Sequence, residues 1–166
     1  MPVDNGRIPS RNPYGARTQR KGHCSLADYR KPIPSPTPET QPFWDGTKAG
    51  ELRLQRCKDD SNVYFPPRPF CPKCGSRNVE WFTASGRGKL HSYVINHRPA
   101  PGFENEAPYA IAVVMTDEGV KMMTNIRDSE QTPEALQLDM PLEVTFEQVN
   151  EEITLPYWKP ASGGAA

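Results

Sequence analysis

The stretch Cys57-Lys-Asp-Asp60-Ser-Asn-Val-Tyr-Phe-Pro-Pro-Arg-Pro-Phe-Cys71-Pro-Lys-Cys74-Gly75 contains three of the four cysteines of the chain. Cys71 and Cys74 are two thiolates on a tight turn, a spacing that can bind one tetrahedral Zn²⁺, and the glycine that follows permits the turn. A four-ligand ribbon needs a second pair of ligands nearby. Cys57 stands at the first position of that pair, and Asp60 stands where the second cysteine belongs. We therefore predict a structural zinc site made by Cys57, Asp60, Cys71 and Cys74.

The aspartate leaves alternatives open, because a carboxylate is a harder and weaker zinc ligand than a thiolate. Asp59 could replace Asp60 as the fourth ligand. The ribbon could also have lost its metal and kept its shape, or Cys71 and Cys74 could form a redox pair. A closed four-ligand zinc site contributes folding free energy and has no open coordination position, so the predicted metal is structural and not catalytic.

Composition excludes several classes of protein. Only 36% of the 166 residues are hydrophobic and 19 are prolines, so much of the chain lies outside any packed core. Lys+Arg and Asp+Glu number 20 each, and this balance argues against a dedicated nucleic-acid binder, which usually has a basic excess. The sequence has neither an apolar run of membrane-spanning length nor a signal-peptide pattern. We expect a soluble, cytoplasmic protein with no membrane association.

The N-terminal part divides into an arm and a short helix. Residues 1–36 are basic and rich in proline, and they predict an extended or disordered arm in which His23 and Cys24 are not metal ligands. Residues 37–50 predict a short helix, capped by Thr37 or Thr40 and ended by a glycine. Its apolar residues are Phe43 and Trp44. A helix this short needs packing, which we expect within the chain, with a partner surface as the alternative.

The rest of the chain alternates in the manner of strands. Residues 51–84 predict a zinc ribbon with strands over 51–57, 63–65 and 79–82. Residues 85–159 predict a five-stranded OB-fold barrel, with a single helical turn over 132–136 between the third and fourth strands, and residues 160–166 form a tail. The second barrel strand, 109–115, is almost continuously apolar and is expected to be buried on both faces. The fold class is therefore mainly β, an arm and a short helix followed by a rubredoxin-like zinc ribbon and an OB-fold.

The order of these motifs resembles a known family, the rubredoxin-like zinc-ribbon/OB-fold proteins that accompany thiolases and related enzymes of acyl-CoA metabolism. The resemblance covers residues 31–159 and departs from the family at Asp60, where cysteine is usual. The stretches that match are Lys31-Pro-Ile-Pro, Pro38-Glu-Thr-Gln-Pro-Phe-Trp-Asp-Gly46, Gly50-Glu-Leu-Arg-Leu-Gln-Arg-Cys57, Tyr64-Phe-Pro-Pro-Arg68, Cys71-Pro-Lys-Cys74-Gly-Ser, Ser85-Gly-Arg-Gly-Lys-Leu90, Tyr109-Ala-Ile-Ala-Val-Val114, Met123-Thr-Asn-Ile126 and Leu138-Asp-Met-Pro-Leu-Glu-Val144.

The resemblance implies a non-catalytic accessory subunit in a hetero-oligomer with a thiolase-family enzyme: a thiolase, a thiolase-like aldolase or an acyltransferase. The catalytic residues would then lie on the partner chain. This subunit would stabilise the partner and help to bind acyl-CoA at the shared interface. Phe43, Trp44 and Phe103 are the candidate partner contacts, the last because its proline-rich loop is expected to expose it. The candidate contacts to CoA phosphates are Arg87, Lys89, His97 and Arg98, which could equally be solvated surface residues.

Two other functions were weighed against this interpretation. His91 and His97 lie six residues apart on one predicted strand and would share a face, but the sequence places no carboxylate to orient them, which argues against independent catalysis. A nucleic-acid-binding module is the other alternative, since zinc ribbons and OB-folds both serve in that role. The predicted barrel has more acidic than basic residues, which argues against it. Salt-dependent retention on single-stranded nucleic acid would favour it.

Overall fold

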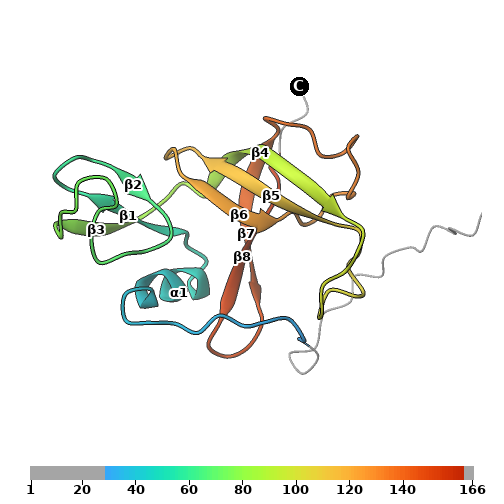
Figure 1. The fold of residues 1–166 in the computed structure, drawn as a ribbon, viewed down its shortest axis with the longest axis horizontal. Coiled ribbons are helices and arrows are strands. Elements are labelled where there is room, and N and C mark those ends of the chain that lie inside the picture. The colour runs from blue at the N-terminus through green and yellow to red at the C-terminus, as the bar shows by residue number, and fades with distance from the viewer. Residues whose placement is uncertain (1–28, 163–166) are drawn as a thin grey trace, which may run out of the picture.

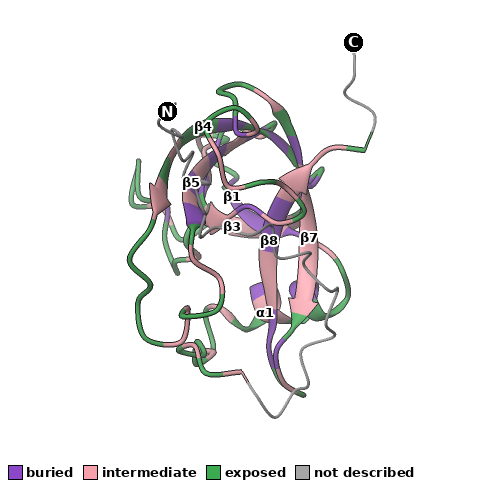
Figure 2. Ribbon diagram, turned by 90° about the vertical axis from the view of Figure 1, so that its right-hand side faces the viewer, coloured by how far each residue is buried: buried purple, intermediate pink, exposed green. Residues whose placement is uncertain are grey.

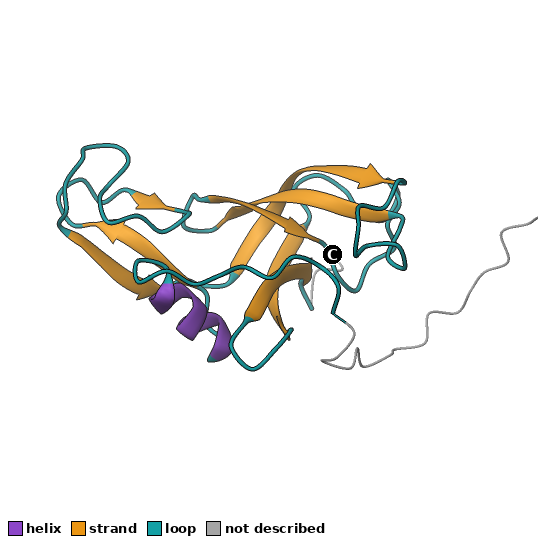
Figure 3. Ribbon diagram, turned by 60° about the horizontal axis from the view of Figure 1, so that its bottom comes forward, coloured by secondary structure: helices purple, strands orange, loops and turns teal. Residues whose placement is uncertain are grey.

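The computed structural model describes residues 29–162, so the predictions for residues 1–28, including His23 and Cys24, lie outside the described residues, as do residues 163–166 (Figure 1). The described part contains one helix and eight strands. The three-stranded ribbon lies at one end, the five-stranded sheet at the other, and the helix below and between them (Figures 1 and 3). The mainly β fold class predicted from the sequence is confirmed.

The helix α1 spans Gln41–Lys48, inside the range predicted for it. Thr40 occupies its N-cap without a side-chain bond to the helix; its hydroxyl instead accepts from the N–H of Thr37 at 2.9 Å. Gly50 has a φ of 76°, a left-handed conformation that favours glycine and ends the helix. The preceding segment, residues 29–36, contains no helix or strand.

The ribbon consists of β1 (Arg53–Cys57), β2 (Val63–Tyr64) and β3 (Val79–Thr83), with β1 in the centre and both pairings antiparallel. The long connections between these strands hold the two predicted metal-binding turns. A small cluster of buried residues supports them, made by Cys57, Tyr64 and Cys71 with Val79 packed against it. So few buried side chains supply little hydrophobic stabilisation, which is why a small ribbon depends on its metal.

The second sheet has the strand order β6-β5-β4-β7-β8, with all neighbours antiparallel. A parallel bridge between Ile126 and Trp158 joins the last residues of β6 to β8 and brings the two edges of the sheet together. This is the nearly closed barrel of an OB-fold. The strands are β4 (Arg87–Asn96), β5 (Tyr109–Thr116), β6 (Lys121–Asn125), β7 (Pro141–Gln148) and β8 (Thr154–Pro160).

Two glycines explain how the barrel begins. Gly86 has a φ of 70°, which suits the turn that leads from the ribbon into β4. Gly88 lies where β4 pairs with both β5 and β7, and a Cβ there would come within 2.6 Å of the carbonyl oxygen of Met115. Only glycine lets the backbones approach this closely, which accounts for the spacing of the Ser85-Gly-Arg-Gly turn.

The ribbon and the barrel share one hydrophobic core. Phe43 of the helix is only 3% exposed, and it belongs to the same buried cluster as Leu52 and Leu54 near the ribbon base and Leu90 and Trp158 of the barrel. Figure 2 shows buried segments in several strands and in α1. Phe43 therefore packs within the chain, as expected, with almost none of its side chain exposed.

Strand β5 corrects one expectation. Ala110, Ala112, Val114 and Thr116 are buried, whereas the alternate residues from Ile111 to Met115 are half-buried. The strand is therefore not fully buried on both faces, because its second face is the outer surface of a barrel and not the interior of a two-layer α/β sheet. The region predicted as a helical turn forms a turn in which the N–H of Leu136 donates to the carbonyl of Thr132 at 3.0 Å.

None of the helices in the described part of the chain has the length and apolar character needed to cross a lipid bilayer.

Candidate metal centre and partner-binding surfaces

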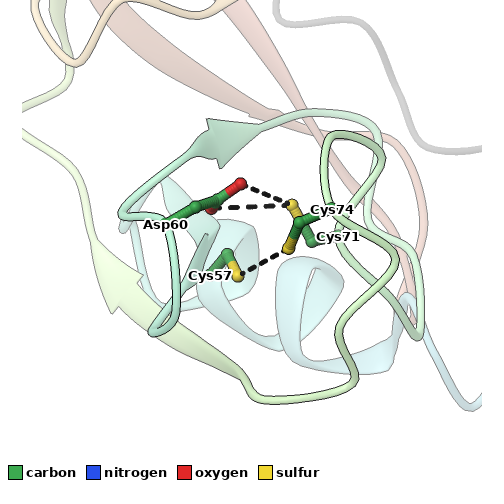
Figure 4. A group of neighbouring side chains, drawn as sticks. All are labelled: Cys57, Asp60, Cys71 and Cys74. Atoms are coloured by element: carbon green, nitrogen blue, oxygen red, sulfur yellow. Dashed lines mark hydrogen bonds between the residues drawn. The ribbon is translucent and has the colours of Figure 1, made fainter.

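Cys57, Asp60, Cys71 and Cys74 converge at the tip of the ribbon, with one potential ligand atom from each lying within 4.8 Å of all the others (Figure 4). The Sγ atoms of Cys57 and Cys74 are 3.6 Å apart, and the Sγ of Cys71 lies 3.7 and 3.6 Å from the two carboxylate oxygens of Asp60. A tetrahedral Zn²⁺ with ordinary bond lengths requires about 3.8 Å between two sulfurs and about 3.6 Å between sulfur and oxygen. The four side chains therefore fit a tetrahedral zinc ion.

The backbone of the two turns favours the anionic form of Asp60 and Cys71. The N–H of Asn62 donates to Asp60 at 3.0 Å, and this bond lowers the pKa of the Asp60 carboxyl. Burial raises the pKa of the Cys71 thiol, but backbone N–H groups, including that of Lys73 at 3.4 Å, outweigh burial and lower it. At Cys74 the N–H of Ser76 lowers the pKa, but burial and the neighbouring thiols outweigh it and raise the pKa of that thiol to about 11. Bound zinc would cross-link the two connections of the ribbon through one carboxylate and three thiolates.

Asp59 is not in a position to serve as the fallback ligand. Its carboxylate accepts hydrogen bonds from the hydroxyl of Ser76 and, at 2.7 Å, from the side-chain amide of Asn78. These two bonds join the first turn to the second beside the cluster and lower the pKa of Asp59. The two neighbouring aspartates thus have different tasks: Asp60 faces the cysteines, and Asp59 ties the turns together. A redox pair would need only Cys71 and Cys74, so the convergence of all four side chains favours a metal.

A groove of about 270 Å³ lies where the helix, the ribbon and the barrel meet. Trp44 lines it and packs edge-to-face on Phe43, with ring centroids 5.1 Å apart. On the opposite side Met123 is 76% exposed. An exposed methionine beside an aromatic groove is typical of surfaces that bind other molecules. The residues that line the groove are Thr40, Phe43, Trp44, Phe65, Pro66, Pro67, Met122, Met123, Thr124, Pro156 and Trp158.

Phe103 is not exposed in the way its loop context predicts. It is half-buried and stacks on Tyr109, with ring centroids 4.9 Å apart, while the ammonium of Lys31 lies 4.6 Å from its ring centroid. The basis for assigning it to a partner was therefore wrong, although its role in binding is not tested by this packing. The contact with Lys31 could not be predicted from local sequence, because Lys31 is distant from Phe103 along the chain.

Lys31 is also the first member of an ion-pair network that sequence reasoning missed. Its side chain is 8% exposed and pairs with Glu106, which also pairs with Arg127 at 3.1 Å. Arg127 continues to Glu147 at 3.3 Å and lies 4.1 Å from the ring centroid of Tyr157. The network fastens the segment before the helix to the barrel. Because its members lie in four separate segments of the chain, no local sequence motif predicts the network.

A β-bulge between Leu90 and Ser92 changes the arrangement of the predicted CoA-binding residues. Before the bulge, the side chains of Arg87 and Lys89 are exposed and alternate with buried Gly88 and Leu90. The extra residue shifts this alternation by one position. Because β4 ends at Asn96, His97 and Arg98 lie beyond the strand, where both are exposed and strand alternation assigns neither to a face.

The expectation that His91 and His97 share a face of one strand is wrong, because His97 lies just after the end of β4. The geometric basis for catalysis by this pair is thereby lost. Arg87, Lys89, His97 and Arg98 are all exposed, and none of them lines the groove described above. Nothing in their arrangement selects phosphate binding over solvated surface charge.

The fold and the metal cluster define the class of the protein, a zinc ribbon joined to an OB-fold. Residues 44–80 match the family model of the ChsH2 rubredoxin-like zinc ribbon domain, and residues 81–147 match that of the ChsH2 C-terminal OB-fold domain. A DUF35 domain-containing scaffold protein of Pyrococcus furiosus is 38% identical over 93 residues, which cover 56% of this chain and 67% of the relative. The chain belongs to this DUF35 family.

Other relatives are described as parts of enzymes. A probable enoyl-CoA hydratase alpha subunit of Thermomonospora curvata is 35% identical over 72% of this chain, but the match spans only 37% of that relative's length. Benzoylsuccinyl-CoA thiolase subunit BbsA of Thauera aromatica is 27% identical over 63% of this chain and 69% of its own length. Among solved structures, a chain of the Ltp2-ChsH2(DUF35) aldolase aligns with a TM-score of 0.68 and 31% identity, covering 78% of this chain and all of that one.

Proposed function

We propose that this protein is a non-catalytic subunit of an acyl-CoA enzyme of the thiolase family, and that it binds and stabilises a catalytic partner chain. The observation that carries the proposal is family membership: relatives of the same fold are described as scaffold proteins, as a thiolase subunit and as part of an aldolase. Their substrates differ, so the substrate of the partner is not inferred.

The metal centre supports a scaffolding function. A closed set of four ligands holds the ribbon tip in shape and has no coordination position for a substrate. Zinc bound here would cross-link the two connections of the ribbon. Catalysis is accordingly assigned to residues of the partner.

The groove beside Trp44 is the second observation that supports binding to a partner protein. Exposed apolar side chains such as Met123 cost free energy in water, and burial of aromatic residues dominates the energetics of protein interfaces. We assign this groove to the partner, with Trp44 as the anchor retained from the sequence prediction. Arg87 and Lys89 are exposed on the first barrel strand and Arg98 is exposed just beyond its end, so we retain these three as candidate contacts for CoA phosphates at the interface.

Co-expression with a thiolase-like chain from the same genome tests the proposal. We expect the two chains to purify together at constant stoichiometry, and the partner alone to be insoluble or strongly reduced in activity. The Trp44→Ala variant of this chain should co-purify less of the partner, because it removes the proposed anchor and leaves the buried Phe43 in place. A partner that is fully active and soluble without this chain would contradict the proposal, as would turnover by this chain alone.

A further inference from the structure

The distal half of β4 has an open edge. Its pairing with β7 covers only Arg87–Lys89, and the carbonyl of Leu90 accepts the N–H of Asp139 at 2.8 Å. From Ser92 to Asn96 the strand pairs with β5 alone among the described elements. Figure 1 shows β4 running past the point where β7 turns away. An unpaired strand edge is a template for another strand.

The backbone groups that face this open edge follow from the bonds of the neighbouring strand. Ala110 bonds on the β6 side, since its N–H donates to the side chain of Gln131 and its carbonyl accepts from that of Asn125. Because backbone groups alternate along a strand, Ile111 bonds on the β4 side, where Val94 is its partner in the register. The N–H and C=O groups of Tyr93 and Ile95 therefore point outward, with the alternate spacing that an extended peptide matches.

Exposed apolar side chains lie on and beside this edge, and their burial against another polypeptide would be favourable. Val94 is 58% exposed, and Leu138, close in sequence to Asp139 where the covered part of the edge ends, is 61% exposed. The sequence has no acidic residue between Glu80 and Glu104. In that interval it has three cationic residues and two histidines: Arg87, Lys89, His91, His97 and Arg98. The open edge is thus apolar at its centre and has basic residues on either side, with Arg87, Lys89 and His91 before it and His97 and Arg98 after it.

From these observations we infer that the distal edge of β4 binds an extended, acidic segment of another polypeptide, which adds a strand to the barrel beyond Asp139. The inference rests on the proposed function in that it assigns the segment to the catalytic partner. Backbone groups of Tyr93 and Ile95 bond the added strand, and the basic side chains select its charge.

The charge of the edge distinguishes this occupant from a second copy of the chain. Two copies paired antiparallel about Val94 would bring the two basic sets together and set His91 of one opposite His97 of the other. Like charges opposite one another weaken a sheet. An acidic segment instead meets complementary charge at both ends of the open edge.

Amide hydrogen exchange on the full chain, alone and bound to the co-expressed partner, tests the inference. In the free chain we expect the amides of Tyr93 and Ile95 to exchange at least about tenfold faster than that of Val94, which bonds to β5. In the complex, their exchange should slow by about a hundredfold or more, as for amides held in a sheet.

Three substitutions at one exposed site separate charge from shape. We expect Val94→Glu to weaken partner binding about tenfold, because it adds a negative charge opposite an acidic strand. Val94→Thr, which keeps the β-branched shape, should change affinity less than about twofold, and Val94→Lys should preserve or increase it. Affinity is measured by titration calorimetry at low and high salt, and the loss in the glutamate variant should shrink at high salt.

The outcomes separate the inference from the function on which it rests. If the complex forms while Tyr93 and Ile95 stay unprotected and Val94→Glu binds normally, the strand-addition inference is overturned and the accessory function stands. If no complex forms, both fail. If the two amides become protected in a concentration-dependent dimer of this chain alone, the occupant is a second copy and the inference is wrong.

Discussion

Replacing Asp60 with asparagine is the sharpest test of the metal centre. The variant keeps the size of the side chain and removes the charge that faces Cys71, whose Sγ lies 3.6 Å from the nearer carboxylate oxygen. Asp59→Asn is the matched control. It makes the same chemical change one residue away, at a carboxylate that bonds to Ser76 and Asn78 instead of facing the cysteines.

The expected magnitude follows from the geometry. Groups that merely orient metal ligands contribute about 10- to 100-fold to metal affinity. Asp60 lies at direct ligand distance from the cluster, so its loss should cost at least the upper end, about 100-fold or about 2.7 kcal/mol. Because zinc binds the folded ribbon, the same free energy is lost from ribbon stability under saturating zinc. The ribbon's own buried cluster is small, so this loss should be plainly visible.

Competition with a chromophoric chelator measures the affinity, and hydrogen exchange in β1 to β3 measures ribbon stability. We expect Asp60→Asn to show both losses and Asp59→Asn to bind zinc within about threefold of the parent chain. Equal affinities for the two variants would refute the assignment of Asp60 as a ligand. A greater loss in Asp59→Asn would mean that Asp59 is the ligand and that the arrangement of the turns has been misjudged.

Three further predictions concern packing and the interface. Phe43→Ala should destabilise the chain by about 3–5 kcal/mol in urea denaturation, because a side chain that is 3% exposed leaves a cavity; a loss below about 1 kcal/mol would contradict its place in the core. Trp44→Ala should weaken partner binding by at least about tenfold in calorimetry while costing less stability than the phenylalanine change, and normal binding would remove the groove from the interface. Lys31→Met should cost about 2 kcal/mol, since it removes the buried partner of Glu106, and an unchanged denaturation midpoint would show that Arg127 alone satisfies that carboxylate.

Much of the fold could be predicted because its signals are local. The C-x-x-C-G motif and the partly alternating sequence before Cys57 fix two chain segments by spacing alone, and Gly50 marks the end of the helix through its backbone conformation. The fourth ligand, Asp60, was also accessible from sequence, because it occupies the position three residues after Cys57 where a second thiolate is expected.

The errors have a common cause in contacts between distant segments. The bulge after Leu90 shifts the register of β4 against β5, and simple alternation along the sequence does not reveal it. Phe103 lies in a loop, yet Tyr109 and Lys31 cover it. Side-chain exposure in a loop depends on which segments return to it, and one sequence does not contain that information.

The single buried cluster that runs from Leu54 through Phe43 to Trp158 has a consequence for how the molecule melts. Although two family models divide the chain at residue 80, this cluster contains buried side chains from both halves, so removing either half exposes part of the other's interior. Heating should therefore produce one cooperative transition for the helix, the ribbon base and the barrel, with only the metal-bearing tip able to open separately. A chimaera that takes its ribbon or its barrel from a relative would therefore also need the helix of that relative.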